Sequence, residues 1–374
     1  MDPRGFPTSL PEFQIVFPDD DACAKYLERM RWPDGFACPK CKQPGEPYRF
    51  PSRSSVVLRC RKCKVNTSLT AGTVMQSSHT PLSVWFWGAF LVTTQTPGQS
   101  ALQFQRQLGL SRYETAFQIL HKLRAGMVRP ERDGIGGEFP VEVDECYVGG
   151  RTRGQGGGIH DNKAVVVGAV EVRLRKDAEH RAAKHKEAHS GGVPVKKLVY
   201  AGRLRLRVVP SRGTYDLNDF VLENVAKGST IRTDGWAGYD QLPQMGYARD
   251  SAVCKGDPEK NETHLPMIHL VFSNLKAWVI GTHHGAIGHH HLQAYLNEYV
   301  FRFNRRFYPM TAFNSILGLA AHAPSATYEQ LYSGEWKHPA GYVEKIDNLQ
   351  SKSPHPSQTS APSGVAEPRA RENF

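Results

Sequence analysis

Three acidic side chains lie close together in the segment VEVDECYVGG, residues 141–150. They are Glu142, Asp144 and Glu145, and the apolar residues around them are typical of a half-buried strand. A buried carboxylate is unfavourable unless it is paired, hydrogen-bonded or bound to a metal. An edge strand with a solvated polar face is the ordinary alternative. A second strand-like run, TIRTD, ends at another carboxylate, Asp234.

The chemistry open to Asp144 and Asp234 depends on a cation, because carboxylates brought together from two strands repel each other. Mg²⁺ and Mn²⁺ accept such hard oxygen ligands. Two of these ions, about 4 Å apart, activate a water or a 3′-hydroxyl and stabilise the leaving oxygen of a phosphodiester. A ribonuclease-H-like domain presents this geometry from adjacent central strands, with a third ligand from a later helix. We therefore treat both aspartates as candidate catalytic residues.

Four of the seven cysteines form two tight pairs, CPKC with Cys38 and Cys41, and CRKC with Cys60 and Cys63. Two C-x-x-C pairs at this separation predict one tetrahedral Zn²⁺ held by four thiolates. Four unrelated cysteines are the alternative. The paired spacing also favours a reducing compartment and metal binding over a secreted disulfide framework.

The net charge of +11 and the isoelectric point of about 9.3 make a polyanion the expected partner. Lys40 and Lys62 lie inside the two cysteine pairs, and Arg302 and Arg306 lie between aromatic residues of FRFNRRF. These four side chains are candidate contacts to the phosphates of double-stranded DNA. The alternatives are a basic protein that is merely soluble, a purely structural ribbon and a solvated helical face.

The apolar pattern divides the chain into five parts. The predicted parts are an N-terminal helical segment (1–35), a zinc ribbon (36–70), a helical region (80–129), a mixed α/β region (138–315) and a disordered tail rich in Pro and Ser (350–374). No run of about 18 apolar residues is present, so no membrane span is expected. The first residues also lack the pattern of an export signal.

The helical region contains the segment SALQFQRQLGLSRYETAFQILHKLRAGM, in which Gly109 separates two helical patterns. Ser111 and Glu114 have the spacing of a capping box at the start of the second helix. A helix, a short glycine turn and a second helix form the outline of a DNA-binding helix-turn-helix. An ordinary helical hairpin fits this stretch equally well.

Five segments resemble, in order, the ISXO-type (ISXO2-like) insertion-sequence transposases. They are VEVDECYVGGR, VVVGAVEV, TIRTDGWAGY, HLVFSNLKAWVIGTHHG and YLNEYVFRFNRR, and the resemblance runs from about residue 20 to 310. That family carries a DDE-type catalytic domain behind a zinc ribbon and uses divalent metal to cut and join DNA at element ends. The resemblance implies an α/β ribonuclease-H-like domain, a mixed sheet flanked by helices. It matches Asp144 and Asp234 with the first two catalytic aspartates.

The third catalytic position departs from the family pattern. Some relatives place a Glu in a helix with a Lys seven residues later. Here the residue seven before Lys276 is His269, which follows Asp234 by 269 − 234 = 35 residues, close to the usual DDE interval. A step of seven residues covers almost two helical turns, so both side chains share a face. Histidine ligates divalent metals, but it suits Mg²⁺ less well than a carboxylate does.

The alternative third ligand is Glu298 in YLNEYVFRFNRR, with Arg305 seven residues later. Asn274 is a weaker candidate. His269 would then be a packed histidine or a DNA contact.

The sequence is thus interpreted as a DNA transposase of an insertion sequence, located in the bacterial cytoplasm at the nucleoid. Two alternatives stay open. One is a non-catalytic DNA-binding protein derived from such an enzyme, which the histidine at the third position favours. The other is a structure-selective nuclease of the same fold. Because transposases hold two ends together, a dimer or larger assembly on DNA is expected by analogy.

Overall fold

The computed structural model describes most of the chain from Pro7 onward. The described residues are 7–51, 55–96, 98–129, 132–149, 163–188, 193–252, 263–284, 287–333 and 339. The predicted disordered tail (350–374) and most of the glycine-rich segment after residue 149 lie outside these ranges. In the described part, no helix is long and apolar enough to cross a membrane.

The N-terminal sheet has three short antiparallel strands in the order β1-β2-β3. They are β1 (Tyr48–Pro51), β2 (Val56–Arg59) and β3 (Asn66–Ser68). Its small core consists of Phe36, Leu58, Cys38 and Cys60. Two cysteines in so small a core indicate that the cysteine cluster, rather than apolar packing, holds this unit together.

Six helices from both ends of the described chain bury one common core. They are α1 (Leu10–Val16), α2 (Asp20–Arg31), α3 (Leu82–Thr94), α4 (Ala101–Gln107), α5 (Tyr113–Gly126) and α12 (Pro309–Ala320). Phe13 is fully buried, and its ring centroid lies 4.5 Å from that of Phe90 and 5.6 Å from that of Phe313. The end of the chain segment that we assigned to the catalytic region (309–315) therefore packs with the N-terminal helices, because the apolar face of α12 completes their core.

The helical hairpin predicted at residues 100–127 is present as α4 and α5. In α5 every residue from Ile119 to Gly126 is buried, and its first residues, such as Tyr113 and Glu114, are exposed. The C-terminal part of α5 packs against α3, α11 and α12. A recognition helix contacts base edges with its N-terminal residues, so both a helix-turn-helix and an ordinary helical hairpin fit this arrangement.

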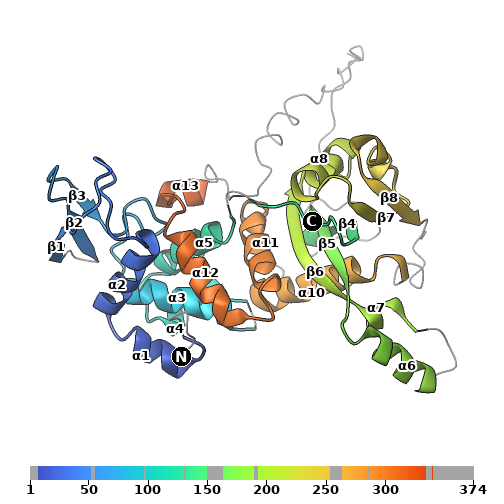
Figure 1. Cartoon of the computed structure of the whole chain (residues 1–374), viewed down its shortest axis with the longest axis horizontal. Helices are drawn as coiled ribbons and strands as arrows, with labels where there is room; N and C mark the ends of the chain where they lie inside the picture. Colours follow the sequence, from blue (N-terminus) through green and yellow to red (C-terminus); the bar gives the residue numbers. More distant parts are fainter. Residues whose placement is uncertain are drawn as a thin grey trace, which may run out of the picture. The chain divides into compact units, whose positions relative to one another are not determined.

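The second sheet has five strands in the order β6-β5-β4-β7-β8 (Figure 1). They are β4 (Val141–Gly149), β5 (Lys163–Leu174), β6 (Val199–Val209), β7 (Thr230–Asp234) and β8 (Ala248–Ala252). Strands β4, β5 and β6 are antiparallel, whereas β7 and β8 run parallel to β4. The polar segment between β5 and β6, predicted as an exposed loop, contains α6 (Ala178–Ala188) and α7 (Val195–Leu198).

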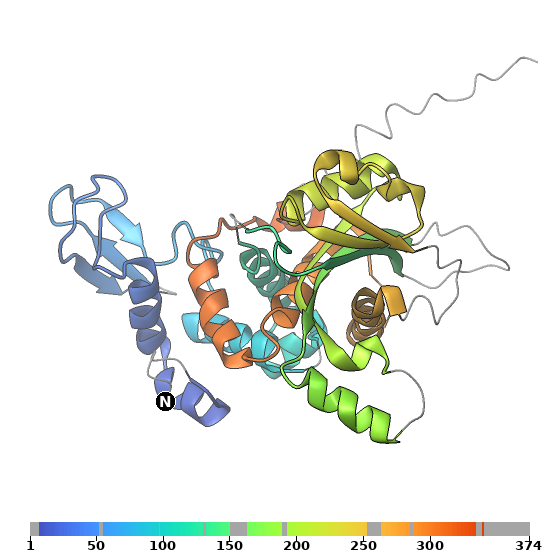
Figure 2. The same cartoon turned by 45° about the vertical axis from the view of Figure 1, so that its right-hand side comes forward.

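Helices cover both faces of this sheet. Strand β4 sends Val141 and Val143 to one face, where they pack with α8 (Thr214–Asn224). It sends Cys146 and Val148 to the other face, where they pack with α10 (Pro266–His283) and α11 (His289–Phe303). The two views show α8 and α10 on opposite sides of the sheet (Figure 1, Figure 2). By this alternation, the even-numbered residues of β4 face α10.

Two short 3₁₀ turns and one C-terminal helix are also present. The turns η1 (Ala237–Tyr239) and η2 (Pro243–Met245) connect β7 to β8, and α13 (Tyr328–Ser333) follows α12.

Candidate functional site

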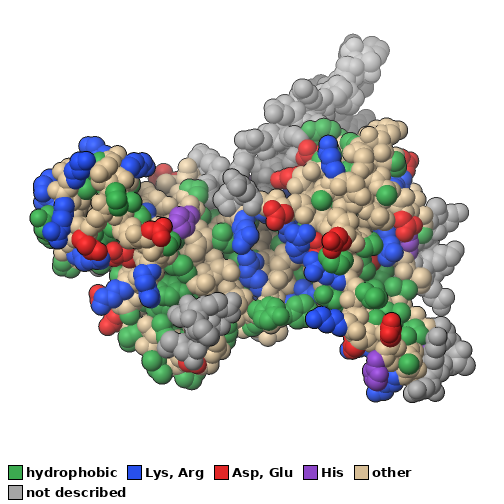
Figure 3. Space-filling model, in the orientation of Figure 1, with side chains coloured by type: hydrophobic (Ala, Val, Ile, Leu, Met, Phe, Trp, Pro, Cys, Tyr) green, Lys and Arg blue, Asp and Glu red, His purple; other side chains and the backbone are tan. Residues whose placement is uncertain are grey.

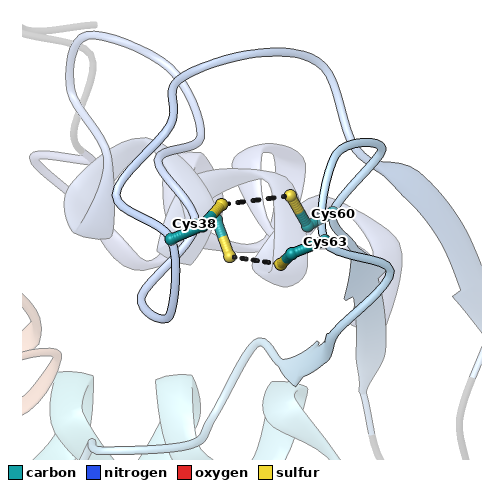
Figure 4. A group of neighbouring side chains, drawn as sticks. Cys38, Cys60 and Cys63 are labelled. Atoms are coloured by element: carbon teal, nitrogen blue, oxygen red, sulfur yellow. Dashed lines mark hydrogen bonds between the residues drawn. The ribbon is translucent and has the colours of Figure 1, made fainter.

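The four paired cysteines come together in the N-terminal sheet (Figure 4). The Sγ atoms of Cys38 and Cys63 are 3.5 Å apart, and those of Cys41 and Cys60 are 3.7 Å apart. All four sulfurs lie within 4.8 Å of one another, and no other group of three or more possible ligands in the described residues is as close. The arrangement supports a structural zinc site with four sulfur ligands, as the spacing predicted.

Each cysteine pair sits in the same kind of backbone turn. Lys42 and Lys64, one residue after each pair, adopt left-handed φ values of 57° and 59°. Their N–H groups donate to the carbonyl oxygens of Cys38 and Cys60, at 2.8 and 3.1 Å. The turn also aims backbone N–H groups at the sulfurs, and those of Cys41 and Lys40 lower the pKa of Cys38 to about 6. A thiol held partly as thiolate is prepared for a metal ion.

The carboxylate of Asp144 faces α10, as its position on β4 requires. Its Oδ2 atom lies 3.1 Å from Nε2 of His269, and its Oδ1 atom accepts the backbone N–H of Glu145 at 2.9 Å. The hydrogen bond to Asp144 raises the pKa of His269 above its ordinary value, although burial opposes this. Two of the predicted site residues, 125 positions apart in the sequence, are therefore in contact.

Asp234 ends β7 on the same face of the sheet as Asp144. The parallel register pairs Val141 with Ile231 and Glu142 with Arg232, and its continuation by two residues sets Asp144 beside Asp234. Burial and the charge of Asp144 both raise the pKa of Asp234. The two carboxylates therefore lie close enough to repel each other, although with His269 they do not form a cluster as compact as the cysteines.

The next carboxylate of β4, Glu145, points to the opposite face. Its Oε1 atom accepts the Nε–H of Arg212 at 2.7 Å, and its Oε2 atom accepts the hydroxyl of Tyr239 at 2.7 Å. Arg212 in turn lies 4.7 Å from the ring centroid of Trp236, and the backbone N–H of Trp236 donates to Asp234 Oδ1 at 3.0 Å. Glu145 thus anchors the segment that follows Asp234 and brings a guanidinium toward the aspartates. Sequence patterns did not single out Arg212, because only the fold brings it here.

Glu142, two residues before Asp144 on the same face of β4, is fully buried. Its Oε2 atom accepts the backbone N–H groups of Met267 and Ile268, each at 2.8 Å. Burial raises the pKa of Glu142 to about 7, whereas these two N–H groups lower it. The three carboxylates of this strand consequently have three different partners: the start of α10, His269, and the Arg212–Tyr239 pair.

Glu298, the alternative third ligand, is held in a buried ion pair on α11. Its Oε2 atom accepts the Nε–H of Arg124 at 2.8 Å, and its Oε1 atom accepts Arg302 at 3.2 Å. Glu298 is fully buried and Arg124 is 2% exposed. Arg124 belongs to α5 and also lies 4.7 Å from the ring centroid of Tyr295. The two guanidinium groups occupy both oxygens of Glu298, so the structure does not bring this carboxylate to Asp144 and Asp234.

The predicted arginine contacts of FRFNRRF are also engaged within the protein. Arg302 donates to the carbonyl oxygens of Gln95 and Thr96, the latter at 2.8 Å, and Arg306 donates to that of Ala201. Arg305 lies 3.8 Å from the ring centroid of Phe301, and burial lowers its pKa to about 10. Arg302 therefore connects α11 to the segment that follows α3, and Arg306 connects the end of α11 to β6.

Lys40 and Lys62, in contrast, are exposed on the turns that hold the cysteines, and Lys276 is exposed on α10. Lys and Arg side chains gather on the face of the molecule over β1 to β3 (Figure 3). The basic surface suggested by the sequence is therefore present at the ribbon. Cys254 lies outside the described residues.

A zinc ribbon followed by a mixed α/β domain with paired aspartates is the architecture expected of a DNA transposase, and comparison with known proteins gives the same class. Residues 135–304 match the family model for the ISXO2-like transposase domain, and residues 18–66 match that for the transposase zinc-ribbon domain. The chain belongs to the ISXO2-like insertion-sequence transposases with an N-terminal zinc ribbon.

One similar protein is described as an uncharacterized protein in transposable element ISH50 of Halobacterium salinarum. It is 24% identical to this chain over 293 residues, which cover 77% of this chain and 92% of that protein. No solved structure matches the chain.

The cysteine geometry leads to a prediction about zinc. We expect about one zinc per chain in the purified protein, and Cys60→Ser should lose it because three sulfurs no longer close a tetrahedral site. Inductively coupled plasma mass spectrometry measures the content. Cys23→Ala, at a cysteine in the helical core, is the control and should keep its zinc. Full zinc content in Cys60→Ser would contradict the assignment.

The buried ion pair leads to a second prediction. Glu298→Gln should lower the free energy of unfolding by about 3–5 kcal/mol, because it leaves the charge of Arg124 buried without compensation. Urea denaturation measures this change. Asp21→Asn, which removes an exposed ion pair with Lys25, should change the same quantity by at most about 1 kcal/mol. A stable Glu298→Gln protein that has lost only metal-dependent cleavage would restore Glu298 as the third ligand.

Proposed function

We propose that this chain is the active transposase of its insertion sequence, and that Asp144, Asp234 and His269 form its metal-binding catalytic site. The observation that carries the proposal is the contact of 3.1 Å between Asp144 Oδ2 and His269 Nε2, beside the end of β7. Residues from three separate elements, β4, β7 and α10, meet there.

The strand order supports a ribonuclease-H-like assignment for residues 138–315. Numbered along the chain, the five strands have the order 3-2-1-4-5. The first three are antiparallel and the last two run parallel to the first. Such a sheet presents carboxylates side by side from its two central strands, β4 and β7, and lets a later helix supply the third ligand. Here that helix is α10.

The donor set fits a divalent cation such as Mg²⁺ or Mn²⁺. Asp144 and Asp234 are hard oxygen donors whose mutual repulsion a cation relieves, and the latter has a raised pKa partly for this reason. Bound divalent ions supply activation of the attacking hydroxyl and stabilisation of the leaving oxygen in phosphodiester chemistry. His269 contributes a nitrogen donor once its imidazole is neutral.

The surrounding side chains hold these groups and the DNA. Arg249 donates to Thr233 Oγ1 at 3.0 Å and to the carbonyl oxygen of Asp234 at 3.3 Å, which fixes the end of β7. Arg212 and Arg249 lower the pKa of Asp234 and offer positive charge to a phosphate. Burial raises the pKa of Cys146 on β4 to about 12, and the charge of Lys276, which is exposed on α10, opposes this rise, so both side chains lie on the same side of the sheet. We assign it to a DNA phosphate near the cleavage point.

DNA binding is assigned to the zinc ribbon, through Lys40 and Lys62, and to the basic charge of the chain as a whole. Because transposition joins two ends, we also propose that two or more copies assemble on double-stranded DNA. Such an enzyme would work at the nucleoid.

A catalytically inactive, transposase-derived DNA-binding protein is the second candidate. The contact between His269 and Asp144 favours it, because a protonated imidazole can compensate the carboxylate without a metal ion. A structure-selective nuclease of the same fold would share the site but would not require the ends of an element.

Removal of either carboxylate tests the catalytic assignment. Asp144→Asn and Asp234→Asn should each lower cleavage of the element's own ends by about 10²–10³-fold or more, because the charge that holds the metal is lost. Gel assays with labelled end fragments and Mg²⁺ or Mn²⁺ measure cleavage, and filter binding should show unchanged DNA affinity. Asp177→Asn, at an exposed site directly before α6, is the control. Wild-type cleavage by either site variant would refute the assignment, and a wild-type protein that cleaves nothing would favour the inactive candidate.

Substitution of the third residue tests the role of His269. His269→Ala should lower cleavage by at least about tenfold, since one metal ligand is lost. His269→Glu should keep or raise cleavage with Mg²⁺, because a carboxylate suits this ion better than imidazole does. Rates with Mg²⁺ and Mn²⁺ in the same assay measure both effects. Equal rates for wild type and His269→Ala would remove His269 from the site.

A further inference from the structure

Helix α10 begins without a capping side chain of its own. Its N-cap residue is Leu265, which offers no side-chain acceptor, and Pro266 occupies the first turn. The N–H groups of the following residues need an acceptor from elsewhere in the protein. Glu142 Oε2 on β4 accepts those of Met267 and Ile268, both at 2.8 Å. A carboxylate at this end of a helix also interacts favourably with the helix dipole.

This cap closes a short ring of contacts around Asp144. Glu142 precedes Asp144 by two residues on the same face of β4, and Ile268 directly precedes His269 on α10. The cap joins Glu142 to Ile268, and the contact of 3.1 Å joins His269 to Asp144. A shift or rotation of the start of α10 would therefore change the distance between His269 and Asp144.

On the neighbouring strand β5, a glycine beside Asp144 allows α10 to approach the sheet closely. Gly168 on β5 pairs with Asp144 in the antiparallel register. A Cβ atom at Gly168 would lie 2.9 Å from Ile268 Cδ1 and 2.9 Å from Phe272 Cε1, which is closer than such atoms approach. The absence of a side chain at this position lets α10 lie directly against the sheet beside Asp144.

Helix stability alone is a poor explanation for Glu142. Its side chain is fully buried, and its Oε1 atom has no hydrogen-bond partner among the described residues. Burial of a carboxylate is costly, whereas a Ser or Thr at the N-cap position would satisfy the same N–H groups without burying a charge. An acceptor on β4 differs from a local cap in one respect, because it joins the helix to the strand that carries Asp144.

We propose that Glu142 is a positioning residue for the catalytic site: by capping α10 from β4, with Gly168 allowing the close approach, it sets the position of His269 relative to Asp144. This inference rests on the proposed function, in which His269 and Asp144 act together on DNA. Glu142 acts through α10 and is not itself assigned to the metal or to DNA.

The first measurement uses the zinc-bound, full-length protein without added Mg²⁺ or Mn²⁺. Glu142→Ala should raise hydrogen exchange of the Met267 and Ile268 amides by about tenfold or more, because their acceptor is lost. Glu142→Gln should stay near wild type, since an amide oxygen can accept the same two N–H groups. The matched control is Glu171→Ala: Glu171 is equally buried on the same sheet, but it holds Arg173 and Arg203. It should leave exchange at the start of α10 unchanged.

The second measurement is cleavage of the element's ends. Glu142→Ala should lower the rate of cleavage by about 10–100-fold at saturating DNA, with DNA affinity unchanged, whereas Glu142→Gln should restore most of the rate. Gly168→Ala disturbs the same contact from β5 while keeping the cap, and it should also lower the rate. If Glu142→Ala does not fold, Gly168→Ala decides: a folded Gly168→Ala protein that cleaves at the wild-type rate overturns the proposal.

The outcomes separate this inference from the proposed function. Unchanged exchange in Glu142→Ala, or raised exchange with wild-type cleavage, overturns the positioning role while leaving the catalytic site intact. If wild type cleaves nothing, the proposed function fails and the positioning role falls with it. The exchange data then describe a helix cap and no more.

Discussion

The α/β region of this protein is organised around two carboxylates that repel each other. Asp144 and Asp234 end up on one face of neighbouring parallel strands because the β4–β7 register sets them side by side. Burial and the charge of Asp144 both raise the pKa of Asp234 above its ordinary value. Much of what surrounds the pair supplies compensation: His269 from α10, and Arg212 and Arg249 from the segments beside β7. A divalent cation would compensate the two negative charges more strongly than these side chains do.

A second electrostatic contact joins the two large cores of the described chain. Glu298 on α11, which packs on the sheet, accepts hydrogen bonds from Arg124 on α5, which packs among the N-terminal helices. Because Arg124 and Glu298 are buried, loss of either one leaves an unpaired charge in the interior. Helix α12 reinforces this junction by packing with the N-terminal helices. The helices that follow the zinc ribbon are thereby attached to the five-stranded sheet.

Several features of this arrangement follow from local sequence. The paired cysteines define the zinc ribbon, because each C-x-x-C forms a self-contained turn whose backbone bonds are local. Asp144 and Asp234 were recognisable because each stands among or just after strand-forming residues, and the seven-residue step from His269 to Lys276 pointed to α10. Other interpretations went beyond what local sequence can support. The arginines of FRFNRRF have the composition of a DNA-binding element, yet Arg302 and Arg306 donate to protein carbonyl groups far away in the sequence.

The sequence by itself determined the family, the zinc ligands and the two strands that carry Asp144 and Asp234, since these depend on residue type, short spacing and backbone preference. Only the tertiary structure decided what each remaining charge does. Glu142, Glu145 and Glu298 are all carboxylates among apolar residues, and nothing in their immediate neighbours distinguishes a helix cap, an arginine anchor and an inter-core ion pair from a metal ligand. Their partners lie 125, 67 and 174 residues away. The low dielectric of the interior makes a close partner decisive for a buried charge, and that partner is brought near only by folding.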